Sequence, residues 1–154
     1  MPSGWRIYKA RHRDGGFSGE GARRGGGRWN SVGVALVYLS EHQSLAALEV
    51  FLQPQPLSSD DQYIVAAAEW DKALMEEVSA SQLPPDWRVL PSGPGTAAIG
   101  DQWVKEGRSA ALALPSAIIP AERNFLLNPA HPDFRRIRIG KPAPFSFDPR
   151  MLHR

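Results

Sequence analysis

The sequence predicts a single α+β domain made of short strands and short helices. Its 154 residues are a single-domain length, and a hydrophobic content of 42% is enough for a buried core without disulfide bonds. The candidate strands and helices follow one another in no regular β–α–β order, which favours a mixed fold over a doubly wound parallel sheet. We therefore expect small mixed sheets with flanking short helices, in one domain spanning residues 1–154.

The first third of the chain contains two predicted strands and one predicted helix. Residues 4–10 (GWRIYKA) are typical of a short strand, and a glycine- and arginine-rich loop follows. Residues 34–39 (VALVYL) are apolar on both faces, which indicates a central strand. Ser40 and Gln43 have capping-box spacing, so a helix is predicted to begin near Ser40 and to end before Pro54.

The remaining elements are predicted from composition and turn signals. A strand over 62–71 precedes a short helix over 72–78 (KALMEEV). A longer helix is expected over 95–107, with Thr96 near its start and Gly107 at its end. Strand and loop then alternate through 109–120, 134–140 and 144–148.

Charge and composition exclude several classes of function. Eighteen Lys and Arg against sixteen Asp and Glu are too balanced to indicate a nucleic-acid binder, although the N-terminal fifth is crowded with arginines, among them Arg11, Arg13, Arg23, Arg24 and Arg28. Cysteine is absent, which excludes thiolate chemistry, and the histidines show no zinc-like grouping, so we expect no metal. With no apolar run of about 18 residues and no signal-peptide pattern, we expect a soluble cytoplasmic protein without membrane contact.

Residues 19–30 (GEGARRGGGRWN) allow two interpretations. A stretch this rich in glycine is either a slack linker or a loop whose backbone approaches an anion closely. It lacks the Lys-Ser/Thr of a phosphate-binding P-loop, and no dinucleotide-binding glycine pattern follows a predicted strand. Neither common nucleotide-binding fold is therefore supported.

Glu49 is the most unusual residue of the predicted helix that begins near Ser40. It shares one helical stripe with Leu45, Leu48 and Leu52, so that a carboxylate occupies a core-facing position. Burial of an unpaired charge costs several kcal/mol, so Glu49 must be protonated, reach a cleft or meet a cation. The alternative is a helix rotated so that Glu49 is solvated at the border of the stripe.

Arg28 and Tyr38 are the candidate companions of Glu49. Arg28 closes the glycine run just before the strand that leads to the helix of Glu49, although a surface arginine on a mobile loop has the same pattern. Tyr38 offers an aromatic ring suited to stacking on a heteroaromatic group, and it could equally be a core tyrosine.

Four motifs in order give the chain a family resemblance. They are GEGARRGGGRWN with the following GVALVYLSEHQSLAALEVF, IGDQW (99–103), LPSAIIPAERNFLLNPAHPDF (114–134) and the terminal FSFDPRML. Together they cover nearly the whole chain and resemble the RES domain, the toxin half of RES–Xre toxin–antitoxin modules. The resemblance implies an ADP-ribosyltransferase-like fold that consumes NAD+ as substrate and arrests growth. It also implies an Xre-type antitoxin with a helix-turn-helix, a toxin dimer within the toxin–antitoxin complex, and operator DNA bound only through the antitoxin.

The resemblance also implies which residues form the site. The family's catalytic residues fall on Arg28, Tyr38, Glu49 and Ser116, and NAD+-binding residues on Arg6, Arg28, Asn30 and Tyr38. This chain has Ser31 and Val32 where relatives often have a proline after GGRWN.

The expected chemistry is cleavage of the nicotinamide–ribose bond, with the acceptor left open. In this hypothesis ionised Glu49 stabilises the oxocarbenium-like ribose, Arg28 and Arg6 bind phosphate or ribose, and Ser116 orients Glu49. Tyr38 would stack on the nicotinamide. Water as acceptor would give an NAD+ glycohydrolase, phosphate an NAD+ phosphorylase, and a protein side chain a mono-ADP-ribosyltransferase. A non-catalytic nucleotide-binding module is the rival from a different class.

Overall fold

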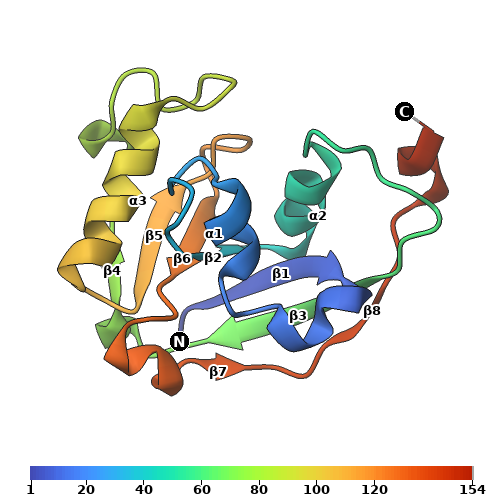
Figure 1. Cartoon of the computed structure of the whole chain (residues 1–154), viewed down its shortest axis with the longest axis horizontal. Helices are drawn as coiled ribbons and strands as arrows, with labels where there is room; N and C mark the ends of the chain where they lie inside the picture. Colours follow the sequence, from blue (N-terminus) through green and yellow to red (C-terminus); the bar gives the residue numbers. More distant parts are fainter. Residues whose placement is uncertain (154) are drawn as a thin grey trace.

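The fold is built on one eight-stranded mixed sheet, in a computed structural model that describes residues 1–153 (Figure 1). The strands are β1 (Ser3–Lys9), β2 (Val37–Ser40), β3 (Tyr63–Glu69), β4 (Met75–Glu77), β5 (Ala111–Pro115), β6 (Arg123–Leu127), β7 (Arg138–Ile139) and β8 (Ala143–Phe145). Their order is β4-β5-β6-β2-β1-β3-β7, and β8 also pairs with β3. Only β4 and β5 pair in parallel within the described residues, so the predicted α+β class with mixed pairing is confirmed.

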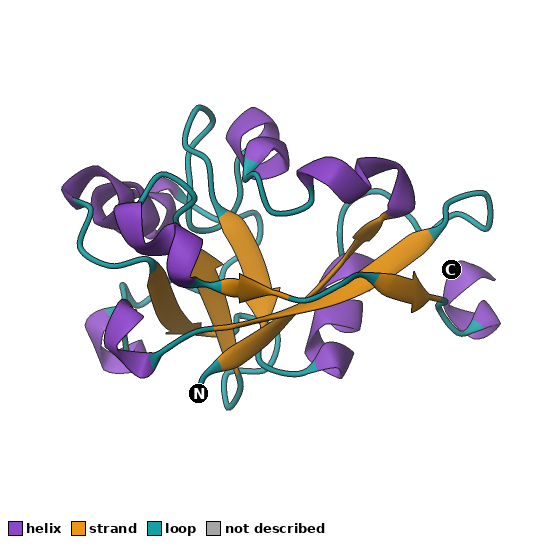
Figure 2. Ribbon diagram, turned by 90° about the horizontal axis from the view of Figure 1, so that it is seen from below, coloured by secondary structure: helices purple, strands orange, loops and turns teal. Residues whose placement is uncertain are grey.

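Short helices and turns surround the sheet, as Figure 2 shows. The helices are α1 (Glu20–Gly25), α2 (Gln43–Phe51) and α3 (Pro94–Glu106). The 3₁₀ turns are η1 (Ala10–Gly15), η2 (Lys72–Leu74), η3 (Ala80–Gln82), η4 (Pro132–Arg136) and η5 (Pro149–His153). Arg154, the last residue of the predicted domain, lies outside the described residues.

The sheet bends where β1 meets β2. These two strands share one residue pair, Trp5 with Ser40, whereas β1 pairs with β3 from Ser3 to Lys9. In Figure 1 the strands on the β2 side run across the direction of β1 and β3. The bend places the two halves of the sheet around a common cleft, which is described below.

Two core clusters fix the elements on either side of this bend. One cluster lies between α3 and the sheet and includes Trp29, Trp103 and Leu126, which are 2%, 0% and 0% exposed. The other lies between α2 and β1 and includes Ile7 and Ala46. Because Trp29 follows Arg28 directly, burial of its indole anchors the end of the glycine-rich segment to the core.

Several predicted elements are confirmed. The strand over 4–10 corresponds to β1, and the strand over 62–71 corresponds to β3. The helix over 95–107 corresponds to α3, which Gly107 closes with a φ of 60°. The central strand over 34–39 corresponds to β2, which is central but spans only Val37–Ser40.

Other local predictions were wrong, because sheet pairing outweighs weak local propensity. The predicted helix over 72–78 is instead η2 followed by β4, which pairs with the buried strand β5. Ser40 does not cap a helix, because its backbone pairs with Asn124 of β6; α2 begins at Gln43. Part of the glycine-rich segment, expected to be a loop, forms the short helix α1. The sequence patterns did not predict strand β6.

Candidate active site

A cleft of about 660 Å³ opens above the bend of the sheet. Its floor comes from β1, β2 and β6, one wall from α1 and the glycine-rich segment, and the other wall from α2. Arg6, Arg28, Tyr38 and Glu49 all line this cleft. Asn30 and Ser116 are buried just behind the lining, at 1% and 0% exposure. The sequence-predicted residues are therefore brought together, four of them at the cleft surface and two in its support.

The glycine-rich segment is packed into the fold and is not a slack linker. A Cβ atom on Gly27 would lie 2.7 Å from the Tyr38 hydroxyl oxygen, so only glycine fits there without displacing the tyrosine. On the facing helix α3, a Cβ on Gly100 would lie 1.7 Å from the Trp29 carbonyl oxygen. Close approach from both sides thus fixes the backbone that carries Arg28.

Arg28 is held by the segment that precedes α3. Its Nη1 donates to the carbonyl oxygens of Trp87 and Val89, at 2.8 and 3.0 Å. Burial lowers the pKa of Arg28, and the negative charge of Glu49 opposes this shift. A half-buried guanidinium with two carbonyl acceptors is inconsistent with a surface arginine on a mobile loop.

The neighbouring arginines have a different role. Arg23 and Arg24 both donate to the carboxylate of Glu20, and neither lines the cleft. Their charge is therefore partly neutralised at the surface. Of the three arginines in residues 19–30, Arg28 is the one at the cleft.

Tyr38 and Asn30 form a hydrogen-bonded pair beneath the glycine-rich segment. The Tyr38 hydroxyl accepts from the Trp29 backbone N–H at 3.1 Å and donates to the Asn30 side-chain oxygen. Burial raises the pKa of Tyr38 strongly, so the hydroxyl stays protonated. The Asn30 amide donates to the carbonyl oxygens of Ala22 and Val34. Asn30 thus supports the segment and reaches the cleft through Tyr38.

Glu49 lies half-buried at the edge of the cleft, one of the outcomes that its sequence position allowed. The predicted apolar stripe is only partly correct, since Leu45 is 1% exposed but Leu52 is 58% exposed. α2 is therefore rotated relative to the prediction, with Leu45 and Ala46 as its buried residues. The rotation brings Glu49 from the core to the cleft wall.

The surroundings of Glu49 favour its protonated, neutral carboxyl group more than bulk water does, so its pKa is raised. Burial raises the pKa of Glu49, while the amide of Asn124, the hydroxyl of Ser116 and the charge of Arg28 oppose the shift. The Ser116 hydroxyl donates to Glu49 Oε1 over a long 3.4 Å and accepts from the backbone N–H groups of Ile118 and Ile119. Arg28 acts on Glu49 across the cleft, without a direct ion pair among the described residues.

Arg6 lies in the floor of the cleft. Its Nε donates to the Gly16 carbonyl oxygen at 2.6 Å and its Nη1 to that of Tyr38 at 3.3 Å, which leaves Nη2 outside these contacts. The guanidinium lies 5.4 Å from the centre of the Tyr8 ring. Burial lowers the pKa of Arg6.

Asn124 is a site residue that the sequence analysis did not single out. It lies in β6 at 9% exposure, lines the cleft, and donates to the Leu39 carbonyl and the Ser40 hydroxyl. A lone asparagine in the otherwise apolar run NFLL was the available signal, because buried polar groups need partners.

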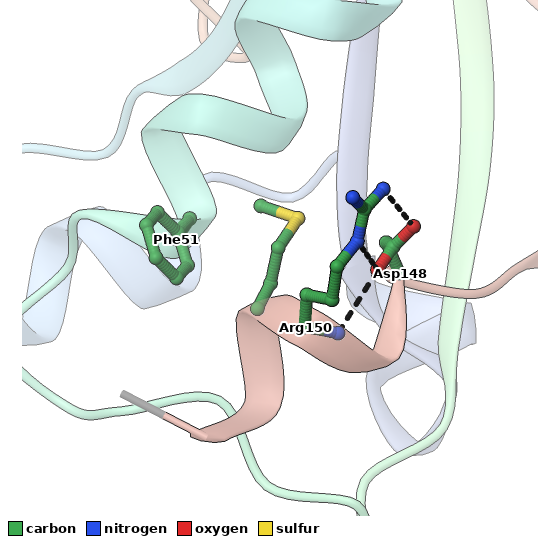
Figure 3. Close-up of a pocket in the computed structure, with 4 residues that line it drawn as sticks. Phe51, Asp148 and Arg150 are labelled. Atoms are coloured by element: carbon green, nitrogen blue, oxygen red, sulfur yellow. Dashed lines mark hydrogen bonds and ion pairs between the residues drawn. The ribbon is translucent and has the colours of Figure 1, made fainter.

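A second pocket brings none of the predicted residues together (Figure 3). It lies between the end of α2 and η5 and is lined by Phe51, Asp148, Arg150 and Met151. Its two charged groups pair with each other, since Arg150 Nε donates to Asp148 at 2.9 Å. Within residues 1–153, no three potential metal ligands are grouped, and no helix has the length and hydropathy to cross a membrane.

Fold and cleft together define a small α+β protein with a cleft lined by both cationic and anionic side chains. The RES domain family matches residues 4–148, and the chain belongs to this family. The family prediction made from the motifs is thereby confirmed.

The relatives in this family carry toxin names. The chain is 39% identical over 144 residues to the "Prs ADP-ribosylating toxin" of Sphingobium sp. (strain YBL2), covering 90% of this chain and 88% of that protein. It is 34% identical over 148 residues to "Toxin Res" of Yersinia enterocolitica, covering 96% and 97%. One chain in the crystal structure of the M. tuberculosis MbcT–MbcA toxin–antitoxin complex has the same fold as this protein, with a TM-score of 0.76 and 19% sequence identity. That match covers 94% of this chain and 84% of the other.

Proposed function

We propose that this protein is a bacterial toxin that cleaves the nicotinamide–ribose bond of NAD+, depletes it and arrests growth. The observation that carries the proposal is a half-buried carboxylate, Glu49, in a cleft that also contains Arg28 and Tyr38. Membership of the RES domain family and the toxin names of its relatives support the same conclusion.

Glu49 stabilises the cationic ribose in this proposal. The bond from ribose C1′ to the nicotinamide nitrogen breaks, and its electron pair leaves with the now neutral nicotinamide. The ribose becomes oxocarbenium-like, and an ionised Glu49 that accepts a bond from a ribose hydroxyl stabilises this charge. Ser116 orients the carboxylate through its hydrogen bond to Oε1. An acceptor oxygen then bonds to C1′ and, if it is water, loses a proton to solvent.

The arginines and Tyr38 bind the rest of the dinucleotide. Arg28 and Arg6 supply charge-assisted hydrogen bonds to phosphate or ribose oxygens. The Tyr38 ring stacks on the nicotinamide while its hydroxyl remains bonded to Asn30. We therefore assign Asn30, expected as an NAD+-binding residue, an indirect contribution through Tyr38.

The acceptor divides the proposal into two candidate activities. We favour degradation of free NAD+, with water or phosphate as acceptor, hence an NAD+ glycohydrolase or phosphorylase. Mono-ADP-ribosylation of a protein is the second candidate, favoured by the 39% identical relative named an ADP-ribosylating toxin. Both share the first chemical step at Glu49.

The proposal extends to partners. An Xre-type antitoxin with a helix-turn-helix would neutralise the toxin in the cytoplasm, and operator DNA would be bound only through that antitoxin. A toxin dimer within the hetero-oligomer is part of the same proposal. Likeness in fold to a chain of a toxin–antitoxin complex supports an antitoxin partner.

The deciding experiment identifies the products by mass. Purified, antitoxin-free protein is incubated with NAD+, with and without phosphate, and with a cell extract as a source of protein acceptors. ADP-ribose, ADP-ribose-1″-phosphate or a protein made heavier by ADP-ribose each selects one acceptor. If no condition releases nicotinamide, the enzymatic proposal is wrong; salt-sensitive NAD+ binding without turnover would instead support a nucleotide-binding module.

A further inference from the structure

The segment 84–93, which we call the strap, forms part of the cleft mouth. It connects η3 with α3, and in Figure 1 it lies near the connection between β5 and β6. Trp87 anchors it in the core at 9% exposure, whereas Leu90 and Ser92 line the cleft. The strap is thus fixed at its centre and faces the cleft beyond that anchor.

Two arginines connect the strap to the glycine-rich wall of the cleft and to the connection between β5 and β6. Arg28 donates from the glycine-rich wall to the carbonyls of Trp87 and Val89, the two residues that flank Arg88. Arg88 itself donates through Nε to the Ala117 carbonyl oxygen at 2.9 Å, in the connection between β5 and β6. The strap therefore links the glycine-rich wall to the β5–β6 connection, and Arg88 supplies the second of these two contacts.

The contact at Ala117 is adjacent to the group that orients Glu49. Ala117 follows Ser116, whose hydroxyl accepts from the Ile118 N–H at 3.1 Å and donates to Glu49. The peptide unit that joins Ala117 to Ile118 thus receives Arg88 at its oxygen and serves Ser116 from its nitrogen. Hydrogen bonds in series polarise and orient one another. A continuous path leads from Arg28, through the strap and Arg88, to Ser116 and Glu49.

We propose that Arg88 is a positioning residue that sets the geometry of Glu49 relative to Arg28. It does not line the cleft, so it acts on Glu49 through the Ala117–Ile118 peptide unit and not on the substrate; its positive charge also lowers the pKa of Arg28. Arg88 is exposed, and its hydrogen bond is to a backbone carbonyl oxygen. Its removal should therefore cost little stability and should affect mainly the arrangement of the cleft. This inference rests on the proposed function for its kinetic readout.

The test compares Arg88→Ala and Arg88→Lys with Arg135→Ala, a matched control at an exposed arginine of η4 outside the cleft. Misplacement of a catalytic group by a fraction of an ångström predicts a fall in kcat of about tenfold for Arg88→Ala, with KM changed by less than about threefold. Arg88→Lys retains the positive charge and an N–H donor for the Ala117 carbonyl, so it should recover most of the loss. The control should match the wild type, and all variants should keep the wild-type Tm.

The acid limb of the pH profile provides a readout that a purely structural role would not move. Loosening Ser116 weakens a hydrogen bond to ionised Glu49, so in Arg88→Ala the pKa of Glu49 should rise further above that of the wild type. NMR titration of the Glu49 carboxyl carbon measures this shift without turnover. If the titration is unchanged and kcat stays within about twofold of the Arg135→Ala control, the positioning role is wrong. A wild type that releases no nicotinamide contradicts the proposed function instead, and the NMR comparison still decides the role of Arg88.

Discussion

The two walls of the cleft hold opposite charges in different ways. Arg28 is fixed by two short hydrogen bonds to carbonyl oxygens, on a backbone held by Gly27 and Gly100. Glu49 is held by a long hydrogen bond from Ser116 and lies beside the Asn124 amide, yet burial still raises its pKa. Only Nη1 of Arg28 makes its two bonds, so Nε and Nη2 remain available to a ligand, whereas the carboxylate of Glu49 is weakly held and retains most of its capacity to accept hydrogen bonds. Such a group is costly for folding and useful for binding a cationic transition state.

The largest expected effect follows from removing the anion. Glu49→Gln keeps the shape of the side chain but not the charge, so we expect nicotinamide release to fall by about 10²-fold or more. Growth arrest should be lost as well. Because the amide is neutral, the variant should fold and show a Tm equal to or above that of the wild type. Product release measured alongside thermal unfolding tests both parts.

Glu106→Gln is the matched control, an identical substitution at the surface end of α3. Its carboxylate pairs with Arg108 at 2.8 Å, and exposed pairs of this kind contribute little. It should leave activity unchanged. If Glu49→Gln released nicotinamide as fast as Glu106→Gln, the anionic wall would not be catalytic.

The arginines test whether the cationic wall depends on one residue. Arg28→Ala removes both strap contacts and the charge at the cleft, and we expect kcat/KM to fall by about 10- to 100-fold. Arg23→Ala and Arg24→Ala each remove one exposed contact to Glu20, which lines the cleft but keeps the other arginine as a partner, so each should stay within about twofold of the wild type. Equal losses in all three variants would mean that a diffuse positive field is sufficient, contrary to the contacts of Arg28.

These contacts also show how far the sequence could be interpreted. The position of Glu49 in an apolar stripe allowed a carboxylate at a cleft as one of several outcomes, and the family motifs predicted Arg28, Tyr38 and Ser116 with it. No local sequence pattern could predict the hydrogen bonds from Arg28 to Trp87 and Val89, because these residues are about 60 positions away in the sequence. The same limit explains β4: the local KALMEEV pattern is helical, and only pairing with the distant β5 makes part of it a strand.

Packing of the cationic wall can be tested without changing any charge. Gly100→Ala would place a methyl group in the Trp29 carbonyl oxygen, and overpacking of this kind costs about 1–3 kcal/mol of unfolding free energy. The backbone of Arg28 should shift with Trp29, so activity should fall together with stability.

Gly95→Ala in the same helix is the control. Its Cβ would meet only Pro84, at 3.7 Å, and alanine should stabilise α3 by up to about 1 kcal/mol. Chemical denaturation that ranked the two variants equally would contradict the close contact between α3 and the glycine-rich segment.

The smallest expected effect is on pH dependence, where the anionic wall should leave a signature of its own. The pKa of Glu49 is raised above its ordinary value of 4.5, so the acid limb of kcat/KM should lie above that value if the ionised form is required. Folded Glu49 keeps its proton to higher pH than the unfolded chain does. Its contribution to stability is therefore present below pH 4.5 and is lost as pH rises through the raised pKa. The Tm advantage of Glu49→Gln over the wild type should accordingly grow across this window and level off above it. Thermal unfolding of both proteins at a series of pH values measures this difference, and a constant difference across the window would show that burial does not perturb Glu49.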